Sequence, residues 1–376
     1  MAFEILPAPG PAPSGVMRRL GITPRSVTMV LSGLTTFVLL LVMMLRPVPY
    51  AIEGAGPTVD TLGDRDGVPL ITVDGAPTYE TSGELRLTTV TLAGGPGYPV
   101  DAGQVIRGWL EAGAAVVPVE AAFEMSVTQA ELDARSTQQM TTSQENATVA
   151  ALTSVGYEVP AVLTIAGDDP SLGAHGVVQE GDVIVSIATL AQPRVQVSTY
   201  QDLAGVLGET PPDTTVSLGV ERDGTVADLE IATGDDGQGG SILGVYLDPD
   251  FDPPVDVSIA IENVGGPSAG TMFALGIIDM MTPGEMTGGH VVAGTGTISL
   301  DGDVGPIGGI AQKLYGAWSD HAEFFLAPAD NCGDVVGNVP DGLKVIRIAT
   351  LVEARAAVEA IAAGTAGDLP TCTSAG

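Results

Sequence analysis

The chain has 376 residues, 45% of them hydrophobic and 16% charged, so it is long enough for two or three folded domains and disorder is not its default state. Asp and Glu total 46 against 14 Lys and Arg, which gives a formal net charge of −32. This acidity argues against direct binding to nucleic acid or to an anionic membrane surface, because phosphate groups would repel the chain. The 50 glycines, 27 prolines and only 4% aromatic residues predict many turns and cores of small aliphatic side chains. We expect an α+β, multidomain protein.

An uncharged apolar segment runs from Ser26 to Leu45, between Arg25 and Arg46. About twenty helical residues at about 1.5 Å each cross a hydrocarbon core of roughly 30 Å. A cleaved signal peptide is the alternative, although its apolar part would be shorter and no clear small-x-small cleavage site follows. The arginines that precede the segment place the N-terminus in the cytoplasm by the positive-inside rule. We therefore predict a single-pass cell-membrane protein with the rest of the chain outside the cytoplasm.

The next part of the chain alternates apolar and polar residues over 85–90 and 115–119, which predicts a β-rich membrane-proximal region. From Ser126 to Leu152 the pattern changes to polar helix formers, and Thr128 followed by Glu131 has the spacing of a capping box. We expect one long helix there.

Residues 156–235 combine strand-like runs with a helix over 200–207 and a hairpin turn at Asp223-Gly224. The glycine-rich stretch 234–240 then has the composition of a linker. With Gly181-Asp-Val-Ile and Arg222-Asp-Gly as its marks, this order of elements resembles the PDZ domains of bacterial extracytoplasmic proteases.

The resemblance implies a groove between a strand and a helix, into which an extended peptide adds as a further strand. We expect the loop that would hold a peptide carboxylate near Gly156-Tyr157. A small β domain that only spaces the following domain from the membrane is the alternative.

A glycine-rich turn, Gly265-Gly-Pro-Ser-Ala-Gly270, opens onto an apolar helical run over 271–281. Such a turn exposes Ser268 and directs free backbone N–H groups at what binds there, which suits an oxyanion. Serine is also a favoured helix cap, so this motif alone leaves both interpretations open.

A helix that begins near Gly309 would place Lys313 in an apolar stripe with Ile310, Leu314 and Ala317. Desolvation lowers the pKa of an amine, which allows a lysine to act as a base near neutral pH. The chain has only one other lysine, Lys344. An amine that reaches out to water is the alternative.

Taken together, the two motifs resemble the proteolytic domain of the Lon protease family. The resemblance extends from about Val255 to Leu351, and its other marks are Thr295-Gly-Thr-Ile-Ser-Leu-Asp-Gly302 and Leu326-Ala-Pro-Ala-Asp-Asn331. It implies that Ser268 is the nucleophile, that Lys313 is the general base, and that Thr295 can hydrogen-bond the lysine. It also implies a homo-oligomer, typically a hexameric ring.

Two departures from the family pattern concern acids, since Gly265 and Thr297 stand where relatives often carry them. No Gly-x4-Gly-Lys-Ser/Thr phosphate loop occurs, so we predict proteolysis without ATP. The expected function is an ATP-independent serine endopeptidase that acts on unfolded or exposed polypeptides outside the cytoplasmic membrane, with the PDZ module binding or gating substrate. The alternative is a PDZ peptide receptor fused to an inactive protease-like scaffold.

Other chemistry has little support. His175, His290 and His321 show no metal-ligand spacing, and the aspartates at 248, 250 and 252 lack the glycine and glutamate of a calcium loop, which favours an acidic linker. We predict no metal and no cofactor. A Ser268/His290 pair remains the alternative to the lysine.

The only two cysteines, Cys332 and Cys372, would lie in an oxidising compartment, where a disulfide between them is plausible. Two unpaired structural cysteines are the alternative. The predicted organisation is a cytoplasmic tail, a transmembrane helix, a membrane-proximal β-rich region with its helix, a PDZ domain, a Lon-like α/β proteolytic domain and a C-terminal tail, over 1–25, 26–46, 47–155, 156–235, 241–364 and 365–376.

Overall fold

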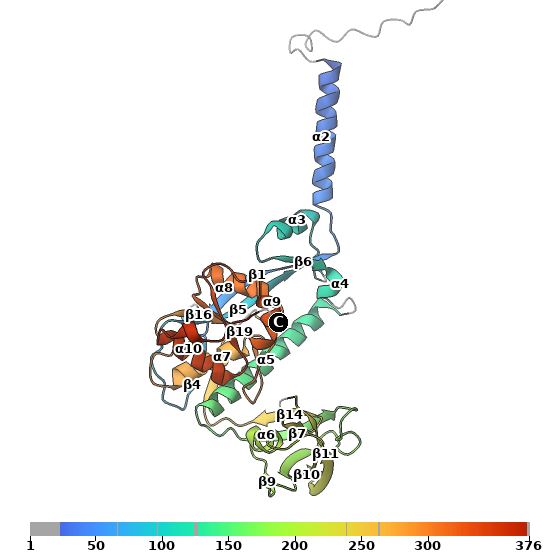
Figure 1. Cartoon of the computed structure of the whole chain (residues 1–376). Coiled ribbons are helices and arrows are strands. Elements are labelled where there is room, and N and C mark those ends of the chain that lie inside the picture. Colours follow the sequence, from blue (N-terminus) through green and yellow to red (C-terminus); the bar gives the residue numbers. More distant parts are fainter. Residues whose placement is uncertain are drawn as a thin grey trace, which may run out of the picture. The chain divides into compact units, whose positions relative to one another are not determined.

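The computed structural model describes residues 23–65, 67–95, 97–123, 127–237, 239–261 and 264–373 (Figure 1). Most of the predicted cytoplasmic tail lies outside the described residues. The chain divides into two compact units. The first contains 1–52, 92–111 and 115–125, and the second contains 53–91, 112–114 and 126–376.

The first unit holds helix α2 (Pro24–Met44), helix α3 (Ala102–Leu110), strand β6 (Ala115–Pro118) and the short helix α4 (Val119–Ala122). Helix α2 begins with a reciprocal hydrogen-bonded cap between Thr23 and Ser26. By length and composition it is the one helix of the described chain that could cross a membrane. It begins and ends two residues earlier than the predicted transmembrane helix, 26–46.

A mixed sheet forms the centre of the second unit, in the order β20-β19-β16-β5-β1, with β6 next to β1. Its strands are β1 (Tyr50–Asp60), β5 (Glu84–Ala93), β16 (Val291–Gly294), β19 (Phe324–Pro328) and β20 (Lys344–Ile348). Strand β16 is parallel to both β5 and β19. The buried helices α7 (Gly270–Met281) and α10 (Leu351–Ala362) contribute to the main core beside this sheet.

Strands β1 and β5 show a difference from the expected organisation. They come from the region 47–155, which we expected to be separate, yet Glu84–Leu87 of β5 pair with Val291–Gly294 of β16 in register. The mixed sheet is therefore built from two parts of the chain that lie about 200 residues apart, because strand pairing satisfies backbone groups across any sequence distance.

Helix α5 (Gln129–Ser154) follows, and the predicted capping box between Thr128 and Glu131 is confirmed. The helix packs against α7, and its buried residues, which include Met140, Ala147 and Ala151, join the core beside the mixed sheet.

Small antiparallel pairs complete this part of the unit. Strand β4 (Ile71–Asp74) pairs with β15 (Asp256–Ile259), and β17 (Thr297–Ile298) pairs with β18 (Val304–Gly305). The pair β2 (Asp64–Arg65) and β3 (Val68–Pro69) lies at a turn.

A second sheet has the order β11-β10-β8-β7-β14, with β9 (Val195–Gln196) paired to β8. Its other strands are β7 (Ala161–Asp168), β8 (Val183–Ala188), β10 (Thr215–Arg222), β11 (Thr225–Ala232) and β14 (Val245–Phe251), and helix α6 (Tyr200–Gly208) accompanies them. The predicted hairpin turn is confirmed, since Arg222 pairs with Thr225 and both Asp223 and Gly224 have positive φ.

Strand β14 differs from the expectation of a linker and a domain start at 241. It pairs antiparallel with β7, from Val245 opposite Asp168 to Phe251 opposite Ala161. Instead, β12 (Gly234–Asp235), which begins the segment 234–240, pairs with β13 (Ser241–Ile242), which directly follows it. The aspartates at 248 and 250 thus lie in a strand at the edge of the second sheet.

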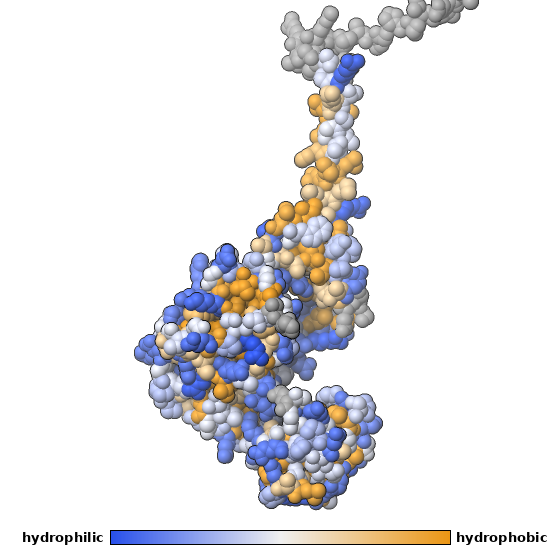
Figure 2. Space-filling view, viewed as in Figure 1, coloured by the Kyte–Doolittle hydropathy of each residue, from blue (hydrophilic) through white to orange (hydrophobic). Residues whose placement is uncertain are grey.

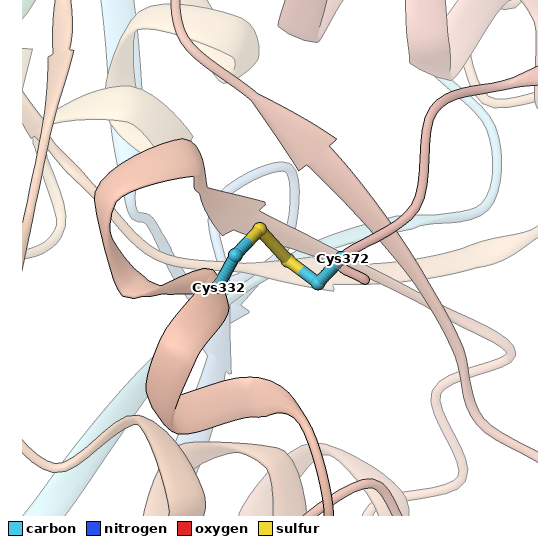
Figure 3. Close-up of a disulfide and its surroundings, with 2 residues drawn as sticks. All are labelled: Cys332 and Cys372. Carbon is cyan, nitrogen blue, oxygen red and sulfur yellow. A yellow bond between two sulfur atoms is a disulfide. The ribbon is translucent and has the colours of Figure 1, made fainter. Parts of the chain in front are cut away.

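A disulfide between Cys332 and Cys372 connects the C-terminal segment to the rest of the second unit, and it decides between the two alternatives that the sequence left open (Figure 3). Cys332 begins the short helix α9 (Cys332–Val335), and the two Cα atoms lie 4.9 Å apart. The backbone N–H of Arg347 in β20 also donates to the carbonyl of Pro370. Residues up to 373 therefore belong to this fold rather than forming a separate tail.

Candidate active site

Ser268 lies in the turn that leads into α7, and glycines shape this turn. Gly266 has φ +82°, a conformation that side chains disfavour. A Cβ on Gly270 would lie 2.6 Å from Ile298 and 2.9 Å from Ser143, so only glycine lets the start of α7 approach α5 and β17 so closely. Ser268 itself remains partly exposed.

Lys313 lies on helix α8 (Ile310–Ser319), in the apolar stripe that the sequence predicted. Ile310, Leu314 and Ala317 are buried with it, and the lysine is only 2% exposed. Its Nζ atom lies 2.7 Å from Ser268 Oγ. The structure therefore brings the two predicted residues, which are 45 positions apart, into direct contact.

Thr295, at the end of β16, joins both residues. Lys313 Nζ donates to Thr295 Oγ1 at 2.8 Å, and that hydroxyl donates to the backbone carbonyl of Ser268 at 2.9 Å. The N–H of Gly296 donates to the same carbonyl at 2.9 Å. The turn that carries Ser268 is thus fixed to β16, and the amine is held between two hydroxyl oxygens.

Burial lowers the pKa of Lys313 from 10.5 to about 7, because the charged form loses its hydration. No carboxylate contributes to this shift. Near pH 7 the charged and neutral forms of the amine are therefore both populated, and the neutral form can accept a proton.

Gly265 and Thr297, the two positions at which relatives often carry acids, have different surroundings. A Cβ on Gly265 would lie 1.9 Å from Ser136 Oγ, so α5 leaves no room for an acidic side chain at this position. Thr297 lies in β17, where its backbone carbonyl accepts from the hydroxyl of Thr271. Neither position places a charge against Lys313.

His290, the alternative base, interacts elsewhere. Its Nδ1 lies 3.1 Å from Glu323 Oε2, and its ring packs edge-on against Phe324. The geometry favours the lysine over the histidine as the partner of Ser268.

A cavity of about 410 Å³ adjoins the serine turn and is bounded by Pro267, Thr297 and Ile298. Its other wall is α5, which contributes Arg135, Gln138, Gln139, Thr142, Ser143 and Asn146. Ser143 Oγ donates to the carbonyl of Pro267, and Asn146 Nδ2 donates to that of Ile298. Local sequence patterns do not indicate this wall, because those of α5 predict only a polar helix.

Residues 257–361 match the family model of the Lon protease (S16) C-terminal proteolytic domain. This range includes Ser268, Thr295 and Lys313. The chain carries a Lon-type proteolytic domain.

Curated relatives agree with this domain assignment. The chain is 34% identical over 117 residues to Lon protease 2 of Sorangium cellulosum, which covers 29% of this chain and 14% of the relative. It is 32% identical over 114 residues to Lon protease 1 of Bacillus subtilis, with 28% and 14% covered. The matched region thus spans about a seventh of those relatives' length.

Among solved structures, PDZ domains of SdrC-like proteins from Listeria monocytogenes and Listeria innocua match this chain. Each has 16% sequence identity and a TM-score of 0.20, covers 23% of this chain, and is itself covered over 86% and 92% of its length, respectively.

The second sheet has a cavity of its own, about 260 Å³ in volume, between α6 and the segment that leads into β14. Its apolar lining includes Leu203, Leu207 and Leu243, with Gly244 at φ +77°. Gly156 and Tyr157, where we expected the carboxylate loop, do not line it. The signal that could have located it is the apolar-Gly-apolar run Leu243-Gly244-Val245, directly after the glycine-rich stretch.

Proposed function

We propose that this protein is a serine endopeptidase in which Ser268 is the nucleophile and Lys313 the general base. The observation that carries the proposal is the 2.7 Å contact between Lys313 Nζ and Ser268 Oγ, with the amine buried and its pKa lowered to about 7. The assignment of residues 257–361 to the Lon proteolytic family supports it.

In this mechanism the neutral amine of Lys313 takes the proton of the Ser268 hydroxyl as Oγ attacks the carbonyl carbon of the scissile peptide bond. The resulting ammonium gives that proton to the leaving amine, which departs and leaves an acyl-serine ester. Lys313 then takes a proton from a water molecule as the water oxygen attacks the ester, and it returns this proton to Ser268 Oγ as the second product leaves. Thr295 holds the amine in line through its hydroxyl.

Backbone amides supply the stabilisation of the oxyanion. The N–H groups of Ser268 and Ala269 donate to no acceptor in the described ranges, and they lie at the N-terminal end of α7. Unpaired amides at a helix start favour a developing negative charge, and one such donor contributes about 10²–10³ in rate.

The substrate is a polypeptide in an extended conformation. The cavity between the serine turn and α5 offers amide and hydroxyl groups to substrate atoms next to the scissile bond. A folded protein does not present an extended segment, so unfolded or exposed segments are the expected substrates.

The second sheet is the substrate-recognition module in this proposal. Strand β14 is at the edge of its sheet, and the apolar cavity lies between this strand and α6. A peptide can add to such an edge as a further strand and place an apolar side chain in the cavity. Binding there delivers the substrate or gates its access.

The location and the energy requirement complete the proposal. Helix α2 anchors the chain in the cell membrane with the protease outside the cytoplasm, as its arginine-flanked apolar sequence favours. Cleavage proceeds without ATP, since the sequence printed here has no Gly-x4-Gly-Lys-Ser/Thr motif. A homo-oligomeric ring is the assembly that the family resemblance suggests.

The decisive experiment compares the wild-type protein with Ser268→Ala on a chemically unfolded protein, with and without ATP. We expect the wild type to cleave equally with and without ATP, and the variant to show no cleavage above background. Ser319→Ala is the matched control, because this serine is exposed and lies on the same helix as Lys313; it should cleave as the wild type does.

Equal cleavage by wild type and Ser268→Ala would exclude Ser268 as the nucleophile. An absence of cleavage in both proteins, together with binding of the unfolded chain, would instead favour the peptide-receptor function.

A further inference from the structure

Helix α3 of the first unit has an apolar face that no other described element covers. Ile106, Trp109 and Leu110 lie on one side of the helix at the spacing i, i+3, i+4, and Trp109 and Leu110 are 64% and 83% exposed. Such a face on a protein surface marks an interaction site when its members are contiguous.

The opposite face of α3 accounts for its folding. Val105 and Gly108 are buried, and a Cβ on Gly108 would lie 3.0 Å from Val116 and 3.2 Å from Ile52. Asp101 caps the helix by accepting from the N–H of Gln104. The helix therefore needs none of its three exposed apolar side chains for its own packing.

One tyrosine contacts this face, and a second precedes α3 in the chain. The ring of Tyr50 meets that of Trp109 edge-on, with centroids 6.5 Å apart. Tyr98, in the turn before α3, is 74% exposed. In a chain with only 4% aromatic residues, three of its nine Trp and Tyr residues thus gather here. We call Tyr50, Tyr98, Ile106, Trp109 and Leu110 the α3 face.

The α3 face begins where the apolar helix α2 ends. The N–H of Ala102 donates to the carbonyl of Arg46, two residues beyond the end of α2, and Val48 donates to Val100. A Cβ on Gly103 would lie 3.7 Å from the carbonyl oxygen of Met44. Figure 1 shows α3 beside the lower end of α2, and in Figure 2 apolar surface continues from α2 onto this part of the first unit.

We propose that the α3 face lies in the lipid headgroup region of the bilayer that α2 crosses, as an interfacial helix on the membrane surface. The proposal rests on the membrane anchor of the proposed function. Trp and Tyr favour this boundary because their rings have an apolar body and a polar edge, and α3 begins at the depth at which α2 leaves the hydrocarbon.

The charges around the face agree with a lipid surface. Helix α3 contains no acidic residue, although the chain as a whole has a net charge of −32. Its one charged side chain, Arg107, is exposed and lies 3.6 Å from Glu111 just beyond the helix. The first unit therefore offers the bilayer an apolar, aromatic face, and the charges at its border, those of Arg107 and Glu111, offset one another.

The test uses tryptophan fluorescence in the full chain, because the protein has only two tryptophans. The Trp318→Phe variant leaves Trp109 as the single reporter and is reconstituted into bilayers of phosphatidylcholine with or without bromine atoms on the upper acyl chain. We expect the brominated lipid to quench Trp109 emission about twofold or more. Trp109→Phe, which leaves Trp318, is the matched control and should be quenched little.

Extraction of the membranes with alkaline carbonate distinguishes failure of the proposal for α3 from failure of the proposed anchor α2. Retention of the protein without quenching of Trp109 overturns the proposal for α3 and leaves the anchor intact. Release of the protein overturns the anchor, and with it the proposal. A third outcome assigns the α3 face to a second copy of the chain instead. In that case the emission of Trp109 is blue-shifted and is not quenched by brominated lipid, and it shifts to the red when the protein is diluted into more lipid. Should Trp318→Phe fail to fold, the wild type decides, because quenching of one of two tryptophans gives an intermediate loss.

Discussion

The two ends of helix α7 each adjoin a buried ionisable group, and the two groups differ in how they are paired. At the N-terminal end, Lys313 Nζ contacts two hydroxyl oxygens, those of Ser268 and Thr295. At the C-terminal end, Asp279 is fully buried; its Oδ1 accepts from the N–H of Met286, and its Oδ2 has no partner among the described residues.

Burial shifts both groups toward their neutral forms. The pKa of Lys313 falls to about 7, and that of Asp279 rises to about 6, in each case mainly through desolvation. The neutral lysine, however, has a hydroxyl within reach to deprotonate, whereas the carboxyl of Asp279 has only the backbone N–H of Met286 as a hydrogen-bond partner among the described residues. A perturbed pKa marks a catalytic group only when a reacting partner lies beside it.

Loss of the base should give the largest effect. We expect Lys313→Met to lower kcat/KM by at least about 10³-fold, because the variant has no group that can take the Ser268 proton.

The wild-type rate should rise tenfold per pH unit up to about pH 7 and then level off, since only the neutral amine of Lys313 acts. Both expectations are tested by measuring initial cleavage rates on a quenched-fluorescence peptide.

Lys344→Met is the control for this comparison, because Lys344 is the only other lysine and its amine lies over the ring of Phe324. It should retain wild-type kcat/KM. Full activity of Lys313→Met would contradict the mechanism and make His290 the candidate general base.

The same variant should be more stable than the wild type. In the unfolded chain a lysine keeps its proton up to about pH 10.4, whereas folded Lys313 loses it near pH 7. This group therefore destabilises the fold most below pH 7, and the penalty fades as the pH rises from about 7 to about 10.4. We expect Lys313→Met to raise the free energy of unfolding by about 2–4 kcal/mol at pH 7, measured by denaturant titration. If the denaturation midpoint of Lys313→Met is unchanged or lower, burial of the Lys313 amine does not destabilise the fold.

Asp279→Asn should act on stability with the opposite pH dependence and leave activity unchanged. The carboxyl of Asp279 has a raised pKa of about 6, so its favourable contribution is complete below about pH 4 and is lost as the pH rises through about 6, roughly 3 kcal/mol in total. The amide cannot ionise, so the variant should not lose stability over this interval.

Thermal midpoints between pH 4 and 7 test this expectation, with Glu285→Gln as the control, because Glu285 is exposed and adds only a small charge effect on Asp279. A reduced kcat/KM in Asp279→Asn would show that the two ends of α7 are coupled.

The sequence predicted the N-terminal end of α7 far better than its surroundings. Ser268 and Lys313 were found because a glycine-rich turn, an apolar stripe and the scarcity of lysine are local patterns, and the capping box at Thr128 was confirmed for the same reason. The family resemblance added the pairing between the two residues. These are features that neighbouring residues specify.

Features that depend on distant partners were missed. Strand β5 joins the mixed sheet through β16, about 200 residues later, and no local pattern encodes such a partner. Strand β14 contains Asp248, Pro249 and Asp250, which are typical of turns, and it is a strand because it pairs with β7. The buried state of Asp279 likewise depends on the packing of α5 and α10 around α7, which the sequence does not show.

Thr295 offers the smallest and most specific test of the pairing at Lys313. Its hydroxyl accepts from Lys313 Nζ, and a hydrogen bond of this kind stabilises the charged amine. We expect Thr295→Val to lower kcat/KM about tenfold, because the amine loses its alignment, and also to lower the apparent pKa of the rate profile below that of the wild type. The loss should therefore be smaller at acid pH than at pH 8. Thr295→Ser keeps the hydroxyl and should restore both the rate and the pKa. If Val and Ser variants lose activity equally and neither moves the profile, Thr295 supports the serine turn only by packing, and Lys313 owes its neutral state to burial alone.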